Sequence, residues 1–494
     1  MKTTKILAAL LAAALTVSLS ACSQPAEKTA AELRFGVTTE PDSLDPYAAV
    51  GGDTKGLLFN VYEGLVKPDS DGNMLPAIAE SWEVLDGAKT YLFTLRKNVR
   101  FHNGTPVTIE DVLYSFERGN AAALPELSNI SGITNEDGKL KITLTDADTE
   151  FLAGMTNAVI PKDSLLLSSY IPGTGPFRID GYTPQQSLTL VKNADYWGAA
   201  AKLDKVTVLI EADTNAVLLS LQSGNLDGAA IATSAAQQLN LNDFNILERN
   251  SNAVQLVALN NAYAPFGDVR VRRAINYAVS RQEIIDKAFF GYGTPVGTPI
   301  IPGFKTYFNA DLTGAYPYAL DSAKRLLADA GYADGFPLEI TVPSNYTVHV
   351  DTAQVLVSQL EKIGVSATIK QVDWPTWLSE TYAGRDYQAT VISVGGASLS
   401  PKAELSRYQS AAAGNFINFA SPDFDAKYAA ASSELDDGTR VTLYKEAQAI
   451  LSDEAASVFV QDIAGLTALA KSFDGLTSYP VYGVNDFSTI YKVK

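Results

Sequence analysis

The chain has 494 residues and a formal net charge of −17 at pH 7, with 46% hydrophobic and 19% charged residues. This length and composition predict a globular protein of two or three domains, and the acidic balance disfavours nucleic acid or anionic lipid as a partner. Because Cys22 is the single cysteine, intrachain disulfides and thiol catalysis are excluded.

The first residues of the chain predict an export signal. Lys2 and Lys5 precede an apolar run from Ile6 to Leu19 of about 14 residues, whereas a membrane-spanning helix needs roughly 20. The run ends in Leu-Ser-Ala-Cys at 19–22, which resembles the lipobox of bacterial lipoproteins, in which the cysteine is lipidated and becomes the N-terminus. An ordinary secretory signal with a chance cysteine is the alternative. We therefore predict a lipoprotein signal peptide over 1–21, lipidation at Cys22 with anchoring to a membrane outer face, and a flexible linker over 22–32.

Strand and helix patterns intermingle along the rest of the chain. Alternation of apolar and polar residues predicts strands, whereas helical spacing between capping residues and glycines predicts helices. The predicted strands are 91–96, 139–145, 205–210, 253–259, 365–372 and 389–394. Two helices are predicted by their starts, one at Thr108 and one at the capping box of Ser280 and Glu283. Three more are predicted over 215–223, over 321–330 with Asp321 as the cap, and over 351–363. Repeated helix–glycine–strand steps indicate α/β layers.

Motifs of catalysis are missing from the sequence. It contains no HExxH, CxxC, GxSxG or P-loop motif, and its two histidines, His102 and His349, lie far apart. We therefore predict a protein that is not an enzyme and has no catalytic residues, cofactor or metal site. A surface hydrolase with two catalytic carboxylates remains a remote alternative, because acidic residues are plentiful.

Two segments that follow predicted strands are candidates for ligand contact. Trp374 lies just past the strand 365–372, and Gly395 and Gly396 follow the strand 389–394. In α/β layers, ligands bind beyond the carboxyl ends of strands, where an indole supplies an apolar wall and glycines permit close approach. Packing of a loop corner and a simple turn are the alternative interpretations.

A series of short motifs runs in order along the mature chain. They are Glu40–Pro46, Val61–Leu65, Pro76–Trp82, Tyr91–Thr105, Gly173–Phe177, Asn193–Trp197, Gly224–Asp227, Asn260–Asn261, Pro265–Arg272 and Ala274–Val279. Each is weak alone, but together and in this order they resemble family 5 extracellular solute-binding proteins. These proteins serve ABC importers for dipeptides, oligopeptides, nickel complexes and some sugars.

The resemblance implies an α/β, two-lobed fold of the periplasmic-binding-protein type (type II, cluster C) with an extra subdomain in lobe 1. We expect lobe 1 over 33–262 with the inserted subdomain at about 48–168. Lobe 2 is expected over 263–474, and residues 475–494 are expected to return to lobe 1.

The same resemblance implies a function. The chain is expected to be a lipid-anchored, extracytoplasmic binding protein on the periplasmic side or outer surface of the cell membrane. It would capture a peptide-like solute by hinge closure and deliver it, as a monomer, to an ABC permease with a separate ATPase. The expected ligand contacts are Thr38, Thr39 and Glu40 after the first strand, Asn260 near the hinge, Trp374, Gly395 and Gly396.

One departure from the family pattern concerns the cargo. Peptide-binding relatives place an aspartate after the strand that corresponds to 389–394, where it pairs with the ligand ammonium, but residues 395–401 contain no acid here. Either Glu40, Asp42 or Asp373 substitutes, or the cargo is not an ordinary free-amine peptide. A chelated metal such as a nickel complex, an opine or an oligosaccharide remains the alternative cargo.

Overall fold

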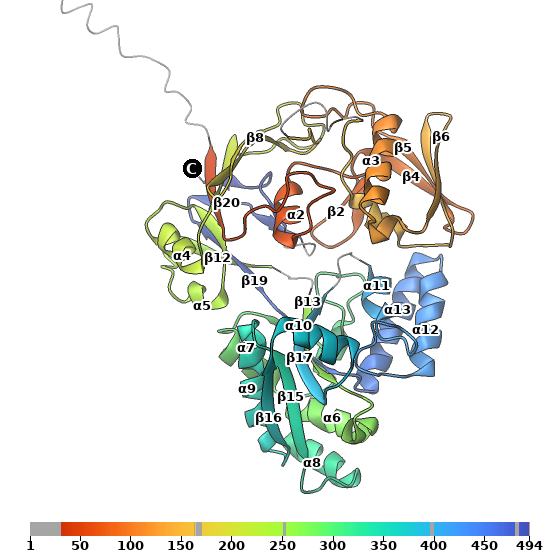
Figure 1. The fold of residues 1–494 in the computed structure, drawn as a ribbon, viewed down its shortest axis with the longest axis vertical. Helices are drawn as coiled ribbons and strands as arrows, with labels where there is room; N and C mark the ends of the chain where they lie inside the picture. Colours follow the sequence, from red (N-terminus) through yellow and green to blue (C-terminus); the bar gives the residue numbers. More distant parts are fainter. Residues whose placement is uncertain are drawn as a thin grey trace, which may run out of the picture.

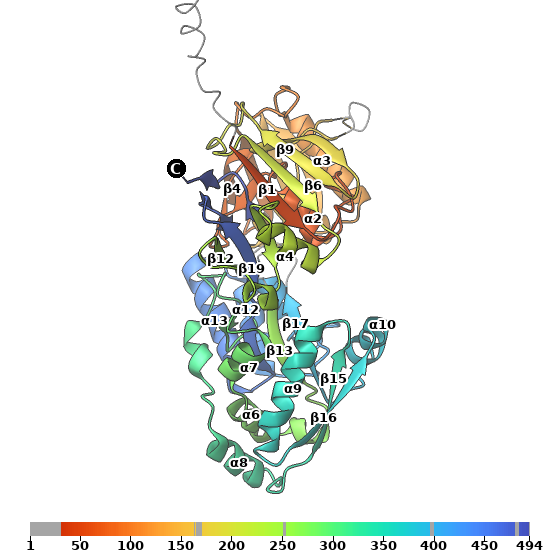
Figure 2. The ribbon, with the colours of Figure 1, turned by 90° about the vertical axis from the view of Figure 1, so that its left-hand side faces the viewer.

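The computed structural model describes residues 31–162, 164, 170–249, 253–395, 400–479 and 484–493. They form two α/β lobes, one above the other along the long axis of the molecule (Figures 1 and 2). Each lobe is built on its own mixed sheet, which confirms the predicted fold class. None of the described helices combines the length and apolar character needed to cross a membrane.

Lobe 1 is organised around a seven-stranded sheet of order β12-β19-β11-β1-β10-β9-β8. Its strands are β1 (Glu32–Val37), β8 (Phe177–Thr183), β9 (Ser187–Lys192), β10 (Lys205–Ile210), β11 (Gly228–Ile231), β12 (Phe244–Arg249) and β19 (Gly465–Ala470). The helices of this part are α2 (Gly52–Leu58), α4 (Thr214–Gln222) and α5 (Thr233–Ala236). β1 pairs in parallel with both β10 and β11, so the carboxyl ends of these three strands lie at one edge.

The C-terminal segment completes lobe 1. Its short strands are β20 (Phe473–Asp474), β21 (Thr477–Ser478), β22 (Asn485–Asp486) and β23 (Tyr491–Lys492). The ring of Phe487 lies 5.2 Å from that of Phe35 on β1, and both are buried in the same core. This contact fixes the C-terminal segment against the first strand of the described chain.

A subdomain within lobe 1 has a separate core. Its four-stranded antiparallel sheet has the order β4-β5-β7-β6 and packs around Tyr91 and Phe93. Its elements are β2 (Val66–Pro68), β3 (Met74–Pro76), β4 (Ala79–Leu85), β5 (Thr90–Leu95), α3 (Ile109–Ala121), η1 (Pro125–Leu127), β6 (Ile130–Glu136), β7 (Lys139–Leu144) and η2 (Phe151–Thr156). Thr108 caps α3 in a capping box with Asp111, at the helix start that the sequence predicts.

Lobe 2 is organised around a six-stranded sheet of order β14-β18-β13-β17-β15-β16. Its strands are β13 (Ala253–Leu259), β14 (Thr294–Pro295), β15 (Pro337–Pro343), β16 (Ser366–Val372), β17 (Ala389–Gly395) and β18 (Val458–Asp462). On β13, Val257 and Leu259 enter one core and Leu256 and Ala258 the other, as the two-residue period of a strand requires. The sheet is therefore covered on both faces.

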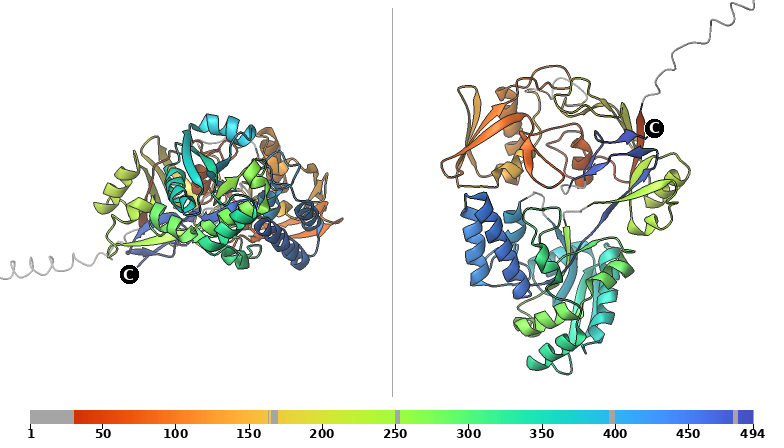
Figure 3. Two further views of the ribbon diagram at one scale, coloured as in Figure 1. Left: turned by 90° about the horizontal axis from the view of Figure 1, so that it is seen from below. Right: turned by 180° about the vertical axis from the view of Figure 1, so that it is seen from behind.

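The helices of lobe 2 pack on the two faces of this sheet. They are η4 (Ala264–Gly267), α6 (Val269–Ala278), α7 (Arg281–Ala288), η5 (Ala310–Gly314), α8 (Leu320–Asp329), α9 (Thr347–Glu361), α10 (Trp374–Thr376), η6 (Trp377–Ala383), α11 (Pro401–Ser406), α12 (Pro422–Ser433) and α13 (Asp437–Asp453). α6 and α9 belong to one core, and α12 and α13 to the other. Seen from behind, α12 and α13 lie below the orange subdomain of lobe 1 (Figure 3).

The chain passes between the lobes at two places. It leaves the lobe 1 sheet after β12 and enters the lobe 2 sheet at β13, and it returns between β18 and β19. Strand membership thus puts the passages between Arg249 and Ala253 and between Asp462 and Gly465, before the expected boundaries at 262/263 and 474/475. The partners of β13 and β19 lie far away in the chain, so strand periodicity alone does not reveal which sheet each strand joins.

Candidate functional site

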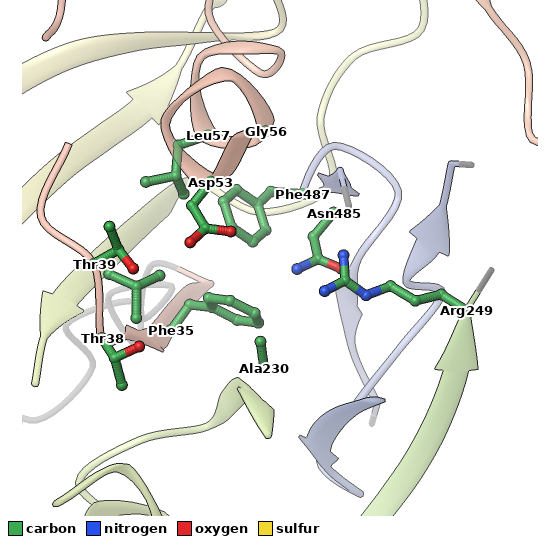
Figure 4. A pocket seen from close by; sticks show the side chains of 11 residues that line it. Phe35, Thr38, Thr39, Asp53, Gly56, Leu57, Ala230, Arg249, Asn485 and Phe487 are labelled. Carbon is green, nitrogen blue, oxygen red and sulfur yellow. The ribbon is translucent and has the colours of Figure 1, made fainter. Parts of the chain in front are cut away.

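A cavity with polar and apolar lining lies at the carboxyl ends of β1 and β11 (Figure 4). It is bordered by α2, which lies on the side of lobe 1 that faces lobe 2 (Figure 1). Its volume is about 90 Å³. The lining residues are Phe35, Val37, Thr38, Thr39, Asp53, Gly56, Leu57, Ala230, Arg249, Asn485 and Phe487. All of them belong to lobe 1, so in this structure lobe 2 does not close over the cavity.

Thr38 and Thr39 follow β1 directly and line this cavity, where their hydroxyls can accept or donate hydrogen bonds. The sequence singles out both residues, and their contact with a solute stays a prediction. Glu40, the next residue, is directed elsewhere. Its carboxylate accepts hydrogen bonds from the Tyr182 hydroxyl at 2.5 Å and the Gln185 backbone N–H at 2.8 Å, and these bonds lower the pKa of Glu40. Glu40 thus holds the β8–β9 turn.

Asn260 does not lie near the hinge, contrary to the expectation. β13 starts at the passage between the lobes, and Asn260 follows its far end. Its amide nitrogen donates to the carbonyls of Tyr387 at 2.7 Å and Arg385 at 3.2 Å, while its oxygen accepts from the Asn418 amide at 2.8 Å. With its polar atoms engaged and its side chain buried, Asn260 ties three segments of lobe 2 together.

Trp374 opens the short helix α10, just past the end of β16. Its half-buried ring stacks on Trp377 with a centroid distance of 5.1 Å and an interplanar angle of 3°, and it meets Tyr346 edge-on at 5.3 Å. Trp377 is buried and donates its indole N–H to the Thr390 hydroxyl at 3.0 Å, so its role is packing. Trp374 is therefore partly exposed and packed against two other aromatic rings.

Gly395 is the last residue of β17 and is exposed, opposite Ala253 at the start of β13. It therefore lies beside the first passage between the lobes. Gly396 and the lipidation candidate Cys22 lie outside the described residues. Contact of Gly395 with a solute stays a prediction.

Two charged residues of the cavity, Asp53 and Arg249, are absent from the sequence-based candidates. Arg249 ends β12, and its aliphatic stem and guanidinium lie over Gly465, where an added Cβ would come within 2.6 Å of the Arg249 Nε. Burial lowers the pKa of Arg249, whereas the charge of Asp53 opposes that shift. Neither residue belongs to a motif, and only the pairing of β12 with β19 brings Arg249 to this edge.

Polar contacts between α11 of lobe 2 and the subdomain of lobe 1 join the two lobes away from the strand passages. The Lys402 ammonium of α11 lies 3.1 Å from the Asp148 carboxylate of the subdomain, and the Lys402 backbone N–H donates to Glu150 at 3.2 Å. The Ser400 hydroxyl also donates to Glu150. Burial raises the pKa of Glu150 despite these bonds, so its ionised form is poorly accommodated between the lobes.

The two histidines have structural positions. His102 accepts a hydrogen bond from the Gly173 N–H at 3.2 Å through Nδ1, and its Nε2 lies 3.1 Å from the Gly175 carbonyl. Burial lowers the pKa of both His102 and His349 to about 4. Among the described residues, no group of three or more histidine, cysteine, aspartate or glutamate side chains is arranged to hold a metal ion.

The sequence of this chain is similar to those of bacterial solute-binding proteins. The family model of bacterial extracellular solute-binding proteins, family 5 Middle, matches residues 73–416. The heme-binding protein A of Haemophilus influenzae is 28% identical, with 98% of each chain covered. The glutathione-binding protein GsiB of Salmonella typhimurium is 28% identical over 95% of this chain and 96% of the relative.

Solved structures with related sequences have the same fold. The substrate-binding protein CtaP of Listeria monocytogenes is 26% identical and superposes with a TM-score of 0.80 over 94% of this chain and 99% of the other. The binding protein AgaA of A. tumefaciens, in complex with agropinic acid, is 27% identical with a TM-score of 0.69 over 94% of this chain and 98% of the other.

Proposed function

Because the chain belongs to the bacterial extracellular solute-binding proteins of family 5, we propose that it captures a peptide-like solute between its lobes and delivers it to an ABC permease. Proteins of this family bind their solutes without chemical turnover, so the protein is not an enzyme. The energy of import comes from the ATPase of the transporter.

The observation that carries the proposal is the one-sided cavity at the edge of lobe 1. Its lining residues all belong to lobe 1, while Trp374 and Gly395 lie on lobe 2 at strand ends. A solute in this cavity would meet lobe 2 only when the lobes close about the two strand passages. Contacts that exist only in the closed form shift the population toward it, which is how binding becomes a signal for the permease.

The peptide-like nature of the cargo is also part of the proposal. Its relatives are named for heme and glutathione, and one solved neighbour holds agropinic acid. Peptide-like solutes share with these last two a polar, amino-acid-derived skeleton that hydroxyls, an indole edge and charged side chains bind well. The alternative cargo is a chelated metal, an opine or an oligosaccharide, and the heme-binding relative and the neighbour that holds agropinic acid support the first two of these.

Closure on a solute is the first testable consequence. Small-angle X-ray scattering of the mature protein should show a smaller radius of gyration when a mixture of dipeptides to pentapeptides is added. Trp374→Ala should weaken the calorimetric affinity at least about tenfold, because an apolar wall is lost at the cleft. Leu378→Ala, an exposed neighbour on η6, is the control. An unchanged radius with every peptide would reject peptide capture.

Lipid anchoring through Cys22 is a further part of the proposal. We expect the full-length protein, expressed in its host, to partition into the detergent phase, and Cys22→Ser to move it into the aqueous phase because the acyl chains are missing. Ser23→Ala is the neighbouring control. If the wild-type protein partitions into the aqueous phase, the anchor is rejected and an ordinary secretory signal remains.

A further inference from the structure

The contact between α11 and the subdomain places a largely buried carboxyl group between the two lobes. Glu150 accepts hydrogen bonds from the Ser400 hydroxyl and, at 3.2 Å, from the Lys402 backbone N–H. Both donors lie at the start of α11 on lobe 2, whereas Glu150 belongs to the subdomain of lobe 1. The lobes therefore cannot separate at this edge without breaking both bonds.

Ionic and apolar contacts also join the subdomain to lobe 2. The Lys402 ammonium lies 3.1 Å from the Asp148 carboxylate, and the Lys305 ammonium of lobe 2 pairs with the Asp71 carboxylate of the subdomain. Met74 of β3 packs against the subdomain core and also against a core of lobe 2. The charged side chains of both ion pairs are partly exposed, so each pair contributes little by itself.

The Glu150 carboxyl group has no cationic partner at this edge. Both hydrogen bonds from α11 end on Oε2, whereas Oε1 is shielded from solvent and has no hydrogen-bond partner among the described residues. The Lys402 ammonium is directed to Asp148, whose negative charge also faces Glu150. Burial raises the pKa of Glu150 above its ordinary value of 4.5, and the charge of Asp148 adds to this shift. A proton on Oε1 removes the charge and leaves both bonds to Oε2 intact.

The other titratable groups that act on this carboxyl group are tyrosines of lobe 2. They are Tyr307, Tyr428 on α12 and Tyr444 on α13. Burial raises the pKa of each of these tyrosines above 10, so their hydroxyls stay neutral while Glu150 ionises. Glu150 is therefore the group whose charge changes at this contact.

We propose that Glu150, with Ser400 and Lys402 as its partners, is a proton-dependent latch that holds the two lobes together at this edge in the absence of solute. With the carboxyl group neutral, both hydrogen bonds form without the cost of an unpaired buried charge. When the proton leaves, the carboxylate is better accommodated by water, and the edge opens. This inference is independent of the chemical nature of the solute.

The sign of the pH dependence follows from the raised pKa of Glu150. Its stabilising contribution to the joined edge is complete below pH 4.5 and is lost as the pH rises through the raised value. Movement between the lobes is the step that a solute controls in hinge closure. The latch therefore links that step to the pH outside the cell before any solute binds.

Spin-label distances in the solute-free mature protein test the latch. Cys22→Ser removes the single native cysteine, and Glu117→Cys on α3 and Thr442→Cys on α13 place one exposed label on each side of this edge (Figure 1). Pulsed electron paramagnetic resonance should show a short-distance population that is at least about threefold larger at pH 5 than at pH 8.5. Glu150→Gln should keep the short distance at both pH values, and Glu150→Ala should lose most of it at both.

Glu404→Gln is the matched control, because it removes another buried carboxyl group of lobe 2 and leaves Glu150 in place. It should keep the pH dependence of the distances, and unfolding midpoints establish that every variant folds. Equal distances at pH 5 and pH 8.5 in the wild type, or a pH dependence that survives in Glu150→Gln, would overturn the latch. Loss of the dependence in Glu404→Gln alone would assign the proton to Glu404 and also overturn it. Closure on a solute in the scattering experiment is measured separately, so the proposed function stands or falls without the latch.

Discussion

Replacing Glu63 by alanine is expected to lower the free energy of unfolding of lobe 1 by about 3–5 kcal/mol, the usual cost of breaking a buried charged network. Glu63 is buried, and its carboxylate accepts hydrogen bonds from the Tyr196 hydroxyl at 2.6 Å and the Trp197 indole N–H at 2.7 Å. The Thr174 hydroxyl donates a third bond at 3.2 Å. The variant removes the carboxylate acceptor that these buried and partly buried donors share.

Urea unfolding followed by tryptophan fluorescence measures this loss, since Trp197 lies in the network itself. Glu117→Ala, an exposed acid on α3, serves as the control and should change stability by less than about 0.5 kcal/mol. A loss below about 1 kcal/mol for Glu63→Ala would mean that water replaces the carboxylate and that the network contributes little to folding.

The Glu63 network explains why several family motifs are found together. The motifs 173–177 and 193–197 meet the motif 61–65 at this carboxylate, although both lie more than a hundred residues away from it in the chain. Gly173 packs so closely on the same segment that an added Cβ would lie 2.1 Å from the Val61 carbonyl oxygen. The residues of these three motifs therefore stabilise the packing of lobe 1, and none of them lines the candidate cavity.

The local structure was largely predictable from the sequence, because it depends on neighbouring residues. The alternating segments 91–96, 139–145 and 205–210 are β5, β7 and β10, and Ser280 caps α7 by accepting from the Glu283 N–H. The predicted cap at Asp321 was wrong, since α8 begins at Leu320 and places Asp321 in its first turn. Likewise α9 starts at Thr347, before the predicted 351, because apolar spacing does not mark a helix start without a capping residue.

The candidate site was only partly predictable, for a physical reason. Its lining comes from segments near residues 37, 55, 230, 249 and 486, which the order of strands in the sheet brings together. Thr38 and Thr39 were predicted because they directly follow β1. Arg249 carries no local signal, since an arginine at a strand end is usually solvated. Asn260 shows the opposite error, a polar residue after a strand whose hydrogen bonds are all internal.

Replacing Glu404 by glutamine is expected to stabilise the protein at high pH. Glu404 of α11 is buried, its nearest cation, the Arg407 guanidinium, is 3.9 Å away, and its Oε1 has no hydrogen-bond partner among the described residues. Burial raises the pKa of Glu404 from 4.5 to about 7, and the charge of Arg407 offsets only part of this. The folded protein therefore prefers the neutral carboxyl group.

The sign of the pH dependence follows from linkage. Because the folded-state pKa of Glu404 lies above its unfolded value, its stabilising contribution is complete below pH 4.5 and is lost as the pH rises through 7. A shift of this size corresponds to about 3 kcal/mol. Glu404→Gln keeps the shape of the neutral side chain, so its unfolding free energy should exceed that of the wild type by under about 1 kcal/mol at pH 5 and by up to about 3 kcal/mol at pH 8.5.

Urea unfolding at pH 5, 7 and 8.5 gives the three points that this prediction needs. Glu361→Gln, an exposed acid at the end of α9, should follow the wild-type curve at every pH. Parallel curves for Glu404→Gln and the wild type would show that Arg407 or water compensates the buried charge in the folded state. A difference that grows with pH would instead identify ionisation of the Glu404 carboxyl group in α11 as a cause of lost stability at high pH.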